Sequence, residues 1–447
     1  MRSARALFAA ICLSACATTS APTNAPTGTS IASASRPALR PSSIEEVSAP
    51  AVAPPRTMPA RYLRTLEHDP GGYDAPGVER TSPNAGKASD LLLGDLLFHS
   101  PRTLGVRAQA MQISCNTCHP NGATHTTLSI DSITDRPGNV DVSSSMFRAA
   151  SDDGIFDPVN IPSLRGCRYT PPYGRDGRIA SLSEFVENVV VTEFDGAPLS
   201  QPELAALVRY VLDLDFLPNA QLDARGDLAD GASAAAHRGA AEFSRPRAGF
   251  GGSSCASCHP SSSFFRDGMV HRLDAGDPPS PHAIENGYET PTLLGLAESA
   301  PYFHDGRFAT LRDVVAWFDR AYALGLSPSA EADLTAYVET VGAVDRSFDD
   351  RPLARRLDQT FAYLSLLTAE QKDRRVWIAA IEAVSRELAN APPAVASRAA
   401  AMRDELGAMR TRVAEGALLA PEADRARALR ESLARLAADW AGSSQEK

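Results

Sequence analysis

Two short strings contain the residue types with the clearest chemistry. The first reads Ser-Cys-Asn-Thr-Cys-His-Pro at 114–120, and the second reads Ser-Cys-Ala-Ser-Cys-His-Pro at 254–260. Cys-x-x-Cys-His is the attachment string of c-type haem, in which both thiols bind the porphyrin and the adjacent histidine ligates the iron. The sequence therefore predicts two covalently bound haem c groups. The attachment residues are Cys115, Cys118 and His119 for one haem, and Cys255, Cys258 and His259 for the other.

Two other kinds of site use Cys-x-x-Cys. A redox-active dithiol is expected within a βαβ unit, and no such unit is visible around either string. A zinc site needs two further ligands at short spacing. His125 offers one ligand for the first string, but the second string has no matching residue at that distance. Two independent matches in one chain favour haem.

Each string lies inside a longer repeat that must position it. An apolar helical stretch, DLLLGDLLFHS, precedes the first string, and AAAHRGAAEF precedes the second. After the strings, the segments 162–186 and 291–315 are identical at eleven of 25 aligned positions, including a Pro-Tyr pair and Asp-Gly-Arg. Each segment ends in the capping pattern of a helix start, Ser181-x-x-Glu184 and Thr310-x-x-Asp313. PELAALVRYVLDL and EADLTAYVETV then have the apolar spacing of closing helices.

This order of elements predicts a mainly α fold. We expect two cytochrome c-like haem domains, residues 61–225 and 226–347, followed by a C-terminal helical region at 348–447. That last region lacks cysteine and histidine, and its amphipathic stretches predict a helical hairpin packed on the haem domains.

The N-terminus has the features of an export signal. Arginines precede an apolar run, which ends in Leu-Ser-Ala-Cys at 13–16. This ending resembles a bacterial lipobox and implies a lipoprotein signal peptide at 1–16, with Cys16 lipidated; the alternative is ordinary cleavage with loss of Cys16. Residues 17–60 are rich in Ala, Pro, Ser and Thr and predict a disordered tether. We therefore expect a lipid-anchored protein on the periplasmic side of a bacterial membrane.

Charge and the remaining cysteines exclude other classes of protein. The formal net charge of the 447-residue chain is -10, which argues against a nucleic-acid partner. Of the seven cysteines, four belong to the strings and two lie in the signal region. Cys167 is left alone, so the sequence does not predict a disulfide framework.

The paired strings, the LGDLLFHSPR lead-in and the repeated PSL–PY–DGR segment resemble the bacterial diheme cytochrome c peroxidase/MauG superfamily. The resemblance implies that peroxide reacts at the N-terminal haem and that the C-terminal haem receives or stores electrons. It implies calcium between the domains, with hydrogen peroxide and a small periplasmic electron donor or an oxidised protein substrate as partners. The matching segment around Pro301 makes His304 a candidate site residue.

The chain departs from that family in three respects: at two single positions, and at the distal residue of the first haem, where Asp135 lies. Where the family supplies a Met or Tyr ligand to the second iron, this sequence has Phe318, which cannot ligate. Met269 is our candidate for that ligand, with His271 and His282 as alternatives. The second departure is Arg175, which stands where the family often has a tryptophan between the haems.

Cleavage of an O–O bond needs a general base and a nearby cation. Asp135 and Arg136 follow the first string and are the candidate catalytic pair, although Pro137 and Gly138 are also typical of a plain polar turn. The leading hypothesis is therefore a diheme peroxidase-type oxidoreductase. The alternatives are a non-catalytic, membrane-tethered diheme electron carrier and a haem-bearing binding module that works through its C-terminal helices.

Overall fold

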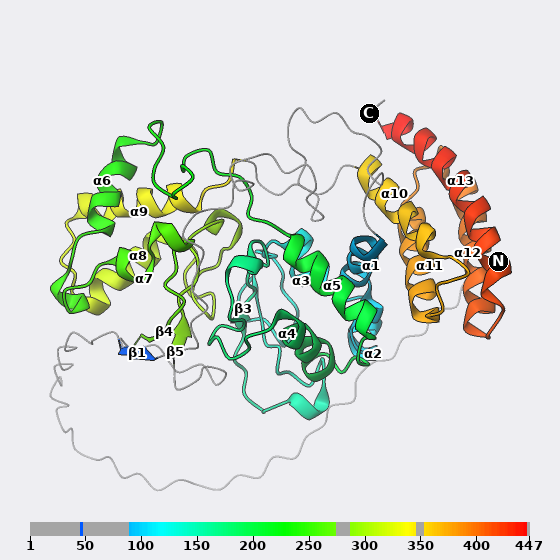
Figure 1. The fold of residues 1–447 in the computed structure, drawn as a ribbon, viewed down its shortest axis with the longest axis horizontal. Helices are drawn as coiled ribbons and strands as arrows, with labels where there is room; N and C mark the ends of the chain where they lie inside the picture. The colour runs from blue at the N-terminus through cyan, green and yellow to red at the C-terminus, as the bar shows by residue number, and fades with distance from the viewer. Residues whose placement is uncertain (1–44, 48–88, 274–286, 346–352, 445–447) are drawn as a thin grey trace, which may run out of the picture. The chain divides into compact units, whose positions relative to one another are not determined.

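The computed structural model describes residues 45–47, 89–273, 287–345 and 353–444 of the chain and is mainly helical, as predicted (Figure 1). The signal region with Cys16 and the candidate ligand His282 lie outside the described residues. The boundaries of the two predicted haem domains stay a prediction. The helices are α1 (Ser89–His99), α2 (Val106–Ala110), α3 (Cys115–Cys118), α4 (Leu182–Asn188), α5 (Gln201–Asp213), α6 (Ala234–Phe243), α7 (Cys255–Cys258), α8 (Leu311–Tyr322), α9 (Pro328–Gly342), α10 (Leu353–Ala362), α11 (Arg374–Ala389), α12 (Ala396–Ala414) and α13 (Leu419–Ser444).

The two predicted haem domains, residues 61–225 and 226–347, form the first and second halves of the repeat. In each half, the leading helix and the closing helix form a tight pair. Helix α1 packs on α5, and α6 packs on α9. A glycine lies at each crossing. A Cβ at Gly94 would be 2.1 Å from the carbonyl oxygen of Ala206, and a Cβ at Gly239 would be 1.9 Å from that of Asp333. The repeated glycine therefore allows two helix backbones to approach closely.

An aromatic pair supports each crossing. Phe98 contacts Tyr210 with 5.1 Å between ring centroids, and Phe243 contacts Tyr337 at 4.9 Å. All four rings belong to the buried cores of their halves. Each phenylalanine follows its glycine by four residues, one helical turn. The Gly-x-x-x-Phe pattern seen in the sequence thus places a small residue and a large one on the same face of the helix.

Helix α1 is buried on two sides. Leu97 and Phe98 face the core shared with α5, whereas Leu92 and Leu96 belong to the core of the C-terminal helices. This explains why its sequence, DLLLGDLLF, is apolar nearly all round rather than along one stripe. In Figure 1, α1 lies between α5 and the C-terminal helices α10 and α11.

The C-terminal region contains more helices than the hairpin that the sequence predicts. The stretch from 363 to 373 ends the first helix and leads through a turn into α11, whose N-cap Asp373 accepts a hydrogen bond from the backbone N–H of Arg375. Helices α10, α11, α12 and α13 then enclose one core, which includes the fully buried Trp377. None of the helices in the described residues is long and apolar enough to cross a membrane.

Short strands occupy the loops of both halves. Strand β2 (Asn139–Val140) pairs with β3 (Val159–Asn160), and β4 (Val270–Arg272) pairs with β5 (Gly287–Glu289), both antiparallel. Strand β1 (Glu45–Val47) pairs antiparallel with the other edge of β4. The predicted tether is therefore hydrogen-bonded to the second half at this point, because the open edge of β4 offers backbone partners. The rest of the tether lies outside the described residues.

The close crossing of α1 and α5 gives a test of the fold. Gly94→Ala should lower the free energy of unfolding by about 1–3 kcal/mol or more, because the added methyl group forces the helices apart. The control is Gly407→Ala in α12, where a Cβ meets no atom within 4 Å. That change should raise stability by about 0.5–1 kcal/mol through helix propensity alone. Urea unfolding followed by circular dichroism measures both, and a Gly94→Ala protein as stable as the parent would contradict the crossing.

Candidate functional site

Both cysteine strings fold in the same way. Each forms a single helical turn, α3 or α7, that begins after a serine N-cap. The backbone N–H of Ser114 donates to Thr117 Oγ1 at 3.0 Å, and that of Ser254 donates to Ser257 Oγ at 3.0 Å. These are reciprocal capping boxes, which our reading of the sequence missed, although Ser-x-x-Thr and Ser-x-x-Ser are visible there. The turn places both thiols on one face, since they are three residues apart.

The histidine that follows each turn is held by its Nδ1 atom. His119 Nδ1 lies 2.9 Å from the carbonyl oxygen of Pro162, and His259 Nδ1 lies 2.8 Å from that of Phe265. A carbonyl only accepts hydrogen bonds, so Nδ1 carries the proton and the Nε2 lone pair is left for a metal. Burial lowers the pKa of His119 to about 4 and also lowers that of His259. Both rings are therefore neutral near pH 7, which is the form that ligates iron.

Three of the four thiols are not those of a redox dithiol. Burial raises the pKa of Cys115 to about 12, and that of Cys118 and Cys255 to about 11. Thiol–disulfide exchange requires a thiolate and therefore a lowered pKa. Within the described residues, the one cluster of three metal-ligating groups is Cys258, Asp267 and His271, which includes only one cysteine of a string. These side chains fit covalent haem better than zinc or redox chemistry.

The candidate second ligands of the C-terminal iron lie in and before β4. Met269 is partly buried, and its backbone N–H donates to Asp267 Oδ1 at 2.9 Å. His271 is buried and its Nε2 lies 2.7 Å from Asp267 Oδ2. Burial alone would lower the pKa of His271, but the hydrogen bond to Asp267 raises it to about 10. The carboxylate thus engages one of the two nitrogens of His271, and ligation by Met269 stays a prediction.

Phe318, where the family pattern supplies an iron ligand, lies in an aromatic cluster. Its ring contacts Trp317 edge-on at 4.9 Å and stacks on Tyr322 at 5.9 Å between centroids. Phe303, from the repeated segment, contacts Trp317 at 4.9 Å. Tyr322 is fully buried, and sequence reasoning did not single it out. This part of α8 is therefore built of packed rings.

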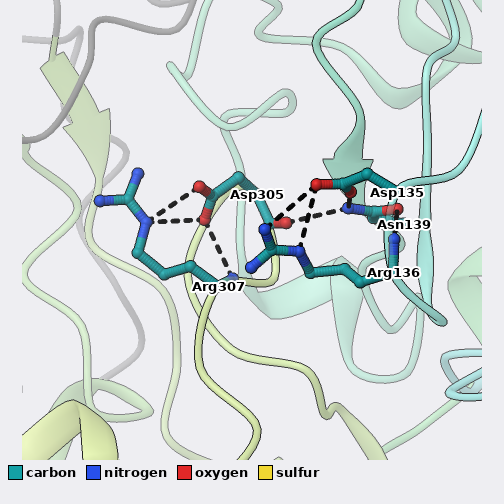
Figure 2. A network of polar contacts seen from close by, with 5 residues as sticks. All are labelled: Asp135, Arg136, Asn139, Asp305 and Arg307. Carbon is teal, nitrogen blue, oxygen red and sulfur yellow. Dashed lines mark hydrogen bonds and ion pairs between the residues drawn. The ribbon is translucent and has the colours of Figure 1, made fainter.

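Asp135 and Arg136 form an ion pair at the contact between the halves (Figure 2). Arg136 Nη2 lies 3.1 Å from Asp135 Oδ2. Asn139 Nδ2 donates both to Asp135 Oδ1 and to the backbone oxygen of Asp305, the latter at 3.1 Å. Arg307 in turn holds the Asp305 carboxylate at 2.9 Å. The structure thus joins Asp135, a candidate catalytic residue, to the second half through the single side chain of Asn139.

A second asparagine makes a parallel link beside His304. The Asn160 backbone N–H donates to the His304 carbonyl oxygen at 2.8 Å, and its side-chain Nδ2 donates to the Pro301 carbonyl oxygen. Asn160 Oδ1 accepts a hydrogen bond of 2.9 Å from Arg175. The His304 ring stacks on Tyr288 with 4.6 Å between centroids. His304 therefore lies where the halves meet, and its catalytic role stays a prediction.

Two partly buried groups beside this link differ in charge. Burial lowers the pKa of Arg175 to about 10, so the guanidinium stays charged at neutral pH. Burial also lowers the pKa of His304 to about 4, with a smaller contribution from the nearby Arg307 and Arg175. The neutral His304 thus lies near the partly buried cation of Arg175, the residue that stands where the family often has a tryptophan.

A stack of rings also crosses between the halves. Tyr169 stacks on Phe264 with 4.8 Å between centroids and an interplanar angle of 15°. Phe216 stacks against both rings at 6.1 Å. Next to Phe264, the buried Arg266 forms an ion pair with Glu289. No pattern in the sequence pointed to this stack, because its members belong to three separate loops.

Comparison with known proteins gives partial matches. No family model matches the chain. Hydrazine synthase subunit gamma of Kuenenia stuttgartiensis is 25% identical over 213 residues, which cover 37% of this chain and 57% of that protein. The chain therefore spans little more than half of that relative's length. Two solved structures each cover 60% of this chain and 94% of their own chain. Kuenenia stuttgartiensis hydrazine synthase has 21% sequence identity and a TM-score of 0.41. A MauG-like protein associated with microbial copper homeostasis has 19% identity and a TM-score of 0.42.

The link through Asn160 gives a test of the contact between the halves. Asn160→Ala should lower the free energy of unfolding by about 1–3 kcal/mol, because the Pro301 carbonyl and the Arg175 guanidinium each lose a buried partner. The control is Asn390→Ala, at an exposed residue whose side chain makes one 3.4 Å hydrogen bond to Arg386. That change should stay within about 0.5 kcal/mol of the parent. Equal stability of both variants in urea would show that the link contributes nothing.

Proposed function

We propose that this protein is a diheme c-type oxidoreductase that reduces hydrogen peroxide at one haem with electrons passed through the other. The observation that carries the proposal is the matching geometry of the two strings. In each, a capped turn presents two thiols, and the following histidine keeps Nε2 unprotonated through a carbonyl at Nδ1. An iron porphyrin bound there supplies the redox chemistry.

Cys115 and Cys118 would hold the first haem covalently, with His119 Nε2 on its iron. Cys255, Cys258 and His259 would hold the second in the same way. The carbonyls of Pro162 and Phe265 orient each imidazole and raise its basicity, as partners behind a metal-ligating histidine do. The chain's contribution is therefore to fix the orientation and the proton location of each ligand.

Reduction of one peroxide to two water molecules consumes two electrons and two protons. In the proposed reaction Asp135 holds and delivers a proton, and Arg136 supplies positive charge beside the oxygen that becomes negative. Both side chains are partly exposed and so reach solvent, the source of protons. Their ion pair sets the position of Asp135 before peroxide arrives.

In this proposal the two electrons come from a small periplasmic donor protein, or from a protein substrate that becomes oxidised as it gives them up. Lipidation at Cys16 would hold the chain on the periplasmic side of a bacterial membrane. The 25% identity to hydrazine synthase subunit gamma supports an enzyme, without favouring peroxide as its substrate.

A non-catalytic electron carrier is the second candidate. One observation favours it: Asp135 and Arg136 are engaged with each other and with Asn139, which ties them to the second half. Side chains used in this way serve to join two parts of a chain. The carrier and the peroxidase share the haem groups, so they differ in one property, the response to peroxide.

Haem attachment is tested by measuring the number of haem groups per chain. The purified exported protein should contain two haem groups per chain in a pyridine haemochrome assay. Cys115→Ser together with Cys118→Ser should leave one, because the second string is intact. Cys167→Ser is the control and should keep both, since this buried thiol lies outside the strings. A parent protein with one haem or none would overturn the proposal at its base.

Peroxide reduction is tested by steady-state kinetics with a reduced small cytochrome as donor. The parent should oxidise the donor in a peroxide-dependent reaction, and Asp135→Asn should lower kcat/KM about 100-fold or more by removing the proton carrier. Asp131→Asn, at an exposed neighbour, is the control and should not change the rate. A parent with two low-spin haems that ignores peroxide would instead support the electron carrier.

A further inference from the structure

A pocket of about 330 Å³ lies where the first half meets the C-terminal helices. Helices α11 and α12 line one side, and α2 and the turn after α1 line the other. Four guanidinium groups and one carboxylate surround it, which leaves a net charge of +3 on a chain whose formal charge is -10. The charged residues are Arg102, Arg386, Arg403, Arg410 and Glu382.

The single carboxylate is already bonded to two of the arginines. Arg102 donates to both oxygens of Glu382, from Nε at 2.6 Å and from Nη2 at 2.8 Å. Arg410 Nε donates to Glu382 Oε1 at 2.8 Å. Burial alone would raise the pKa of Glu382, but these guanidinium groups lower it, so the carboxylate stays charged. Glu382 thus fixes two of the arginines with three hydrogen bonds, none of which comes from Arg386 or Arg403.

Neither Arg386 nor Arg403 forms a hydrogen bond or ion pair with an acidic side chain of the described residues, and Glu382 acts on Arg386 only as a nearby charge that partly opposes the effect of burial on its pKa. Arg386 lies one helical turn after Glu382 on α11, and Arg403 lies two turns before Arg410 on α12, so all four side chains face one space. Arg386 is partly buried, and burial lowers its pKa, yet an arginine stays charged at neutral pH. A half-buried cation with unused donors is costly unless an anion comes to it.

We propose that this pocket binds a small polyvalent oxyanion, with Arg386 and Arg403 as its main contacts and Arg102 and Arg410 beside them. Guanidinium forks match the paired oxygens of phosphate and carboxylate groups. The volume is in the range of small-molecule sites. The side-chain amides of Gln109 and Gln112 add neutral donors on the far wall.

The proposal does not depend on the chemistry at the haems. Arg102 belongs to the turn after α1, and Gln112 lies three residues before Cys115. An anion held here would therefore join the C-terminal helices to the segment that leads into the first string. This assigns the C-terminal helices a ligand in addition to their role in covering α1.

Isothermal titration calorimetry on the full-length holoprotein tests the site, with inorganic phosphate, pyrophosphate and citrate as probes at low salt. At least one probe should bind with Kd below about 1 mM. Arg386→Gln and Arg403→Gln should each weaken that binding about tenfold or more, the loss expected for one charge-assisted contact. The probe that binds most tightly distinguishes a phosphate-bearing ligand from a polycarboxylate.

The matched control is Arg398→Gln, also on α12, where the arginine pairs with Asp439 at 2.7 Å outside the pocket. Its affinity should equal that of the parent. Absence of binding by the parent, or equal weakening by Arg398→Gln, would overturn the proposal. Binding of a heparin fragment but of none of the three small anions would also overturn it, in favour of a macromolecular partner. Circular dichroism of each variant confirms that a loss of binding is not a loss of fold.

Discussion

The hydrogen bond between each string histidine and a loop carbonyl is the constraint on which the site depends. His119 is tied to Pro162 and His259 to Phe265, so each imidazole is anchored to backbone rather than to another side chain. The position of a loop's backbone is set by the side chains and other segments that pack against that loop. The orientation of each imidazole, and of any metal bound to it, therefore depends on the loops that carry these two carbonyls.

Those same loops make the contact between the halves. Asn160, two residues before Pro162, is bonded to His304. Phe264, just before Phe265, stacks on Tyr169. Arg266, just after it, donates a hydrogen bond to the carbonyl oxygen of Tyr169. Each string is thus one short loop away from the opposite half. A change at the contact between the halves would reach both histidines through backbone, without needing a side-chain relay.

The sequence predicted local features well and long-range contacts poorly. The helices around Gly94 and Gly239, the serine and threonine caps, and the two strings all follow from patterns of a few neighbouring residues, and the structure has these helices and caps. The roles of Asn139 and Asn160 could not be predicted in this way. Each is a single polar residue whose partner in the second half lies more than 140 positions away. The basic pocket brings together three chain segments and has no signature in any one of them.

Arg175 shows why a departure from a family pattern needs the structure to interpret it. In the sequence, Arg175 shows only that the tryptophan often found between the two haems in the family is absent from this position. In the structure, its guanidinium bonds to Asn160 in the same half, and its backbone oxygen accepts a hydrogen bond from the N–H of Glu289 in the second half. Since burial does not lower its pKa below about 10, it is also a fixed positive charge there. A tryptophan at this position would supply neither the charge nor the side-chain bond to Asn160. The aromatic contact between the halves is made instead by Tyr169 and Phe264, so the cation and the ring occupy separate places in this chain.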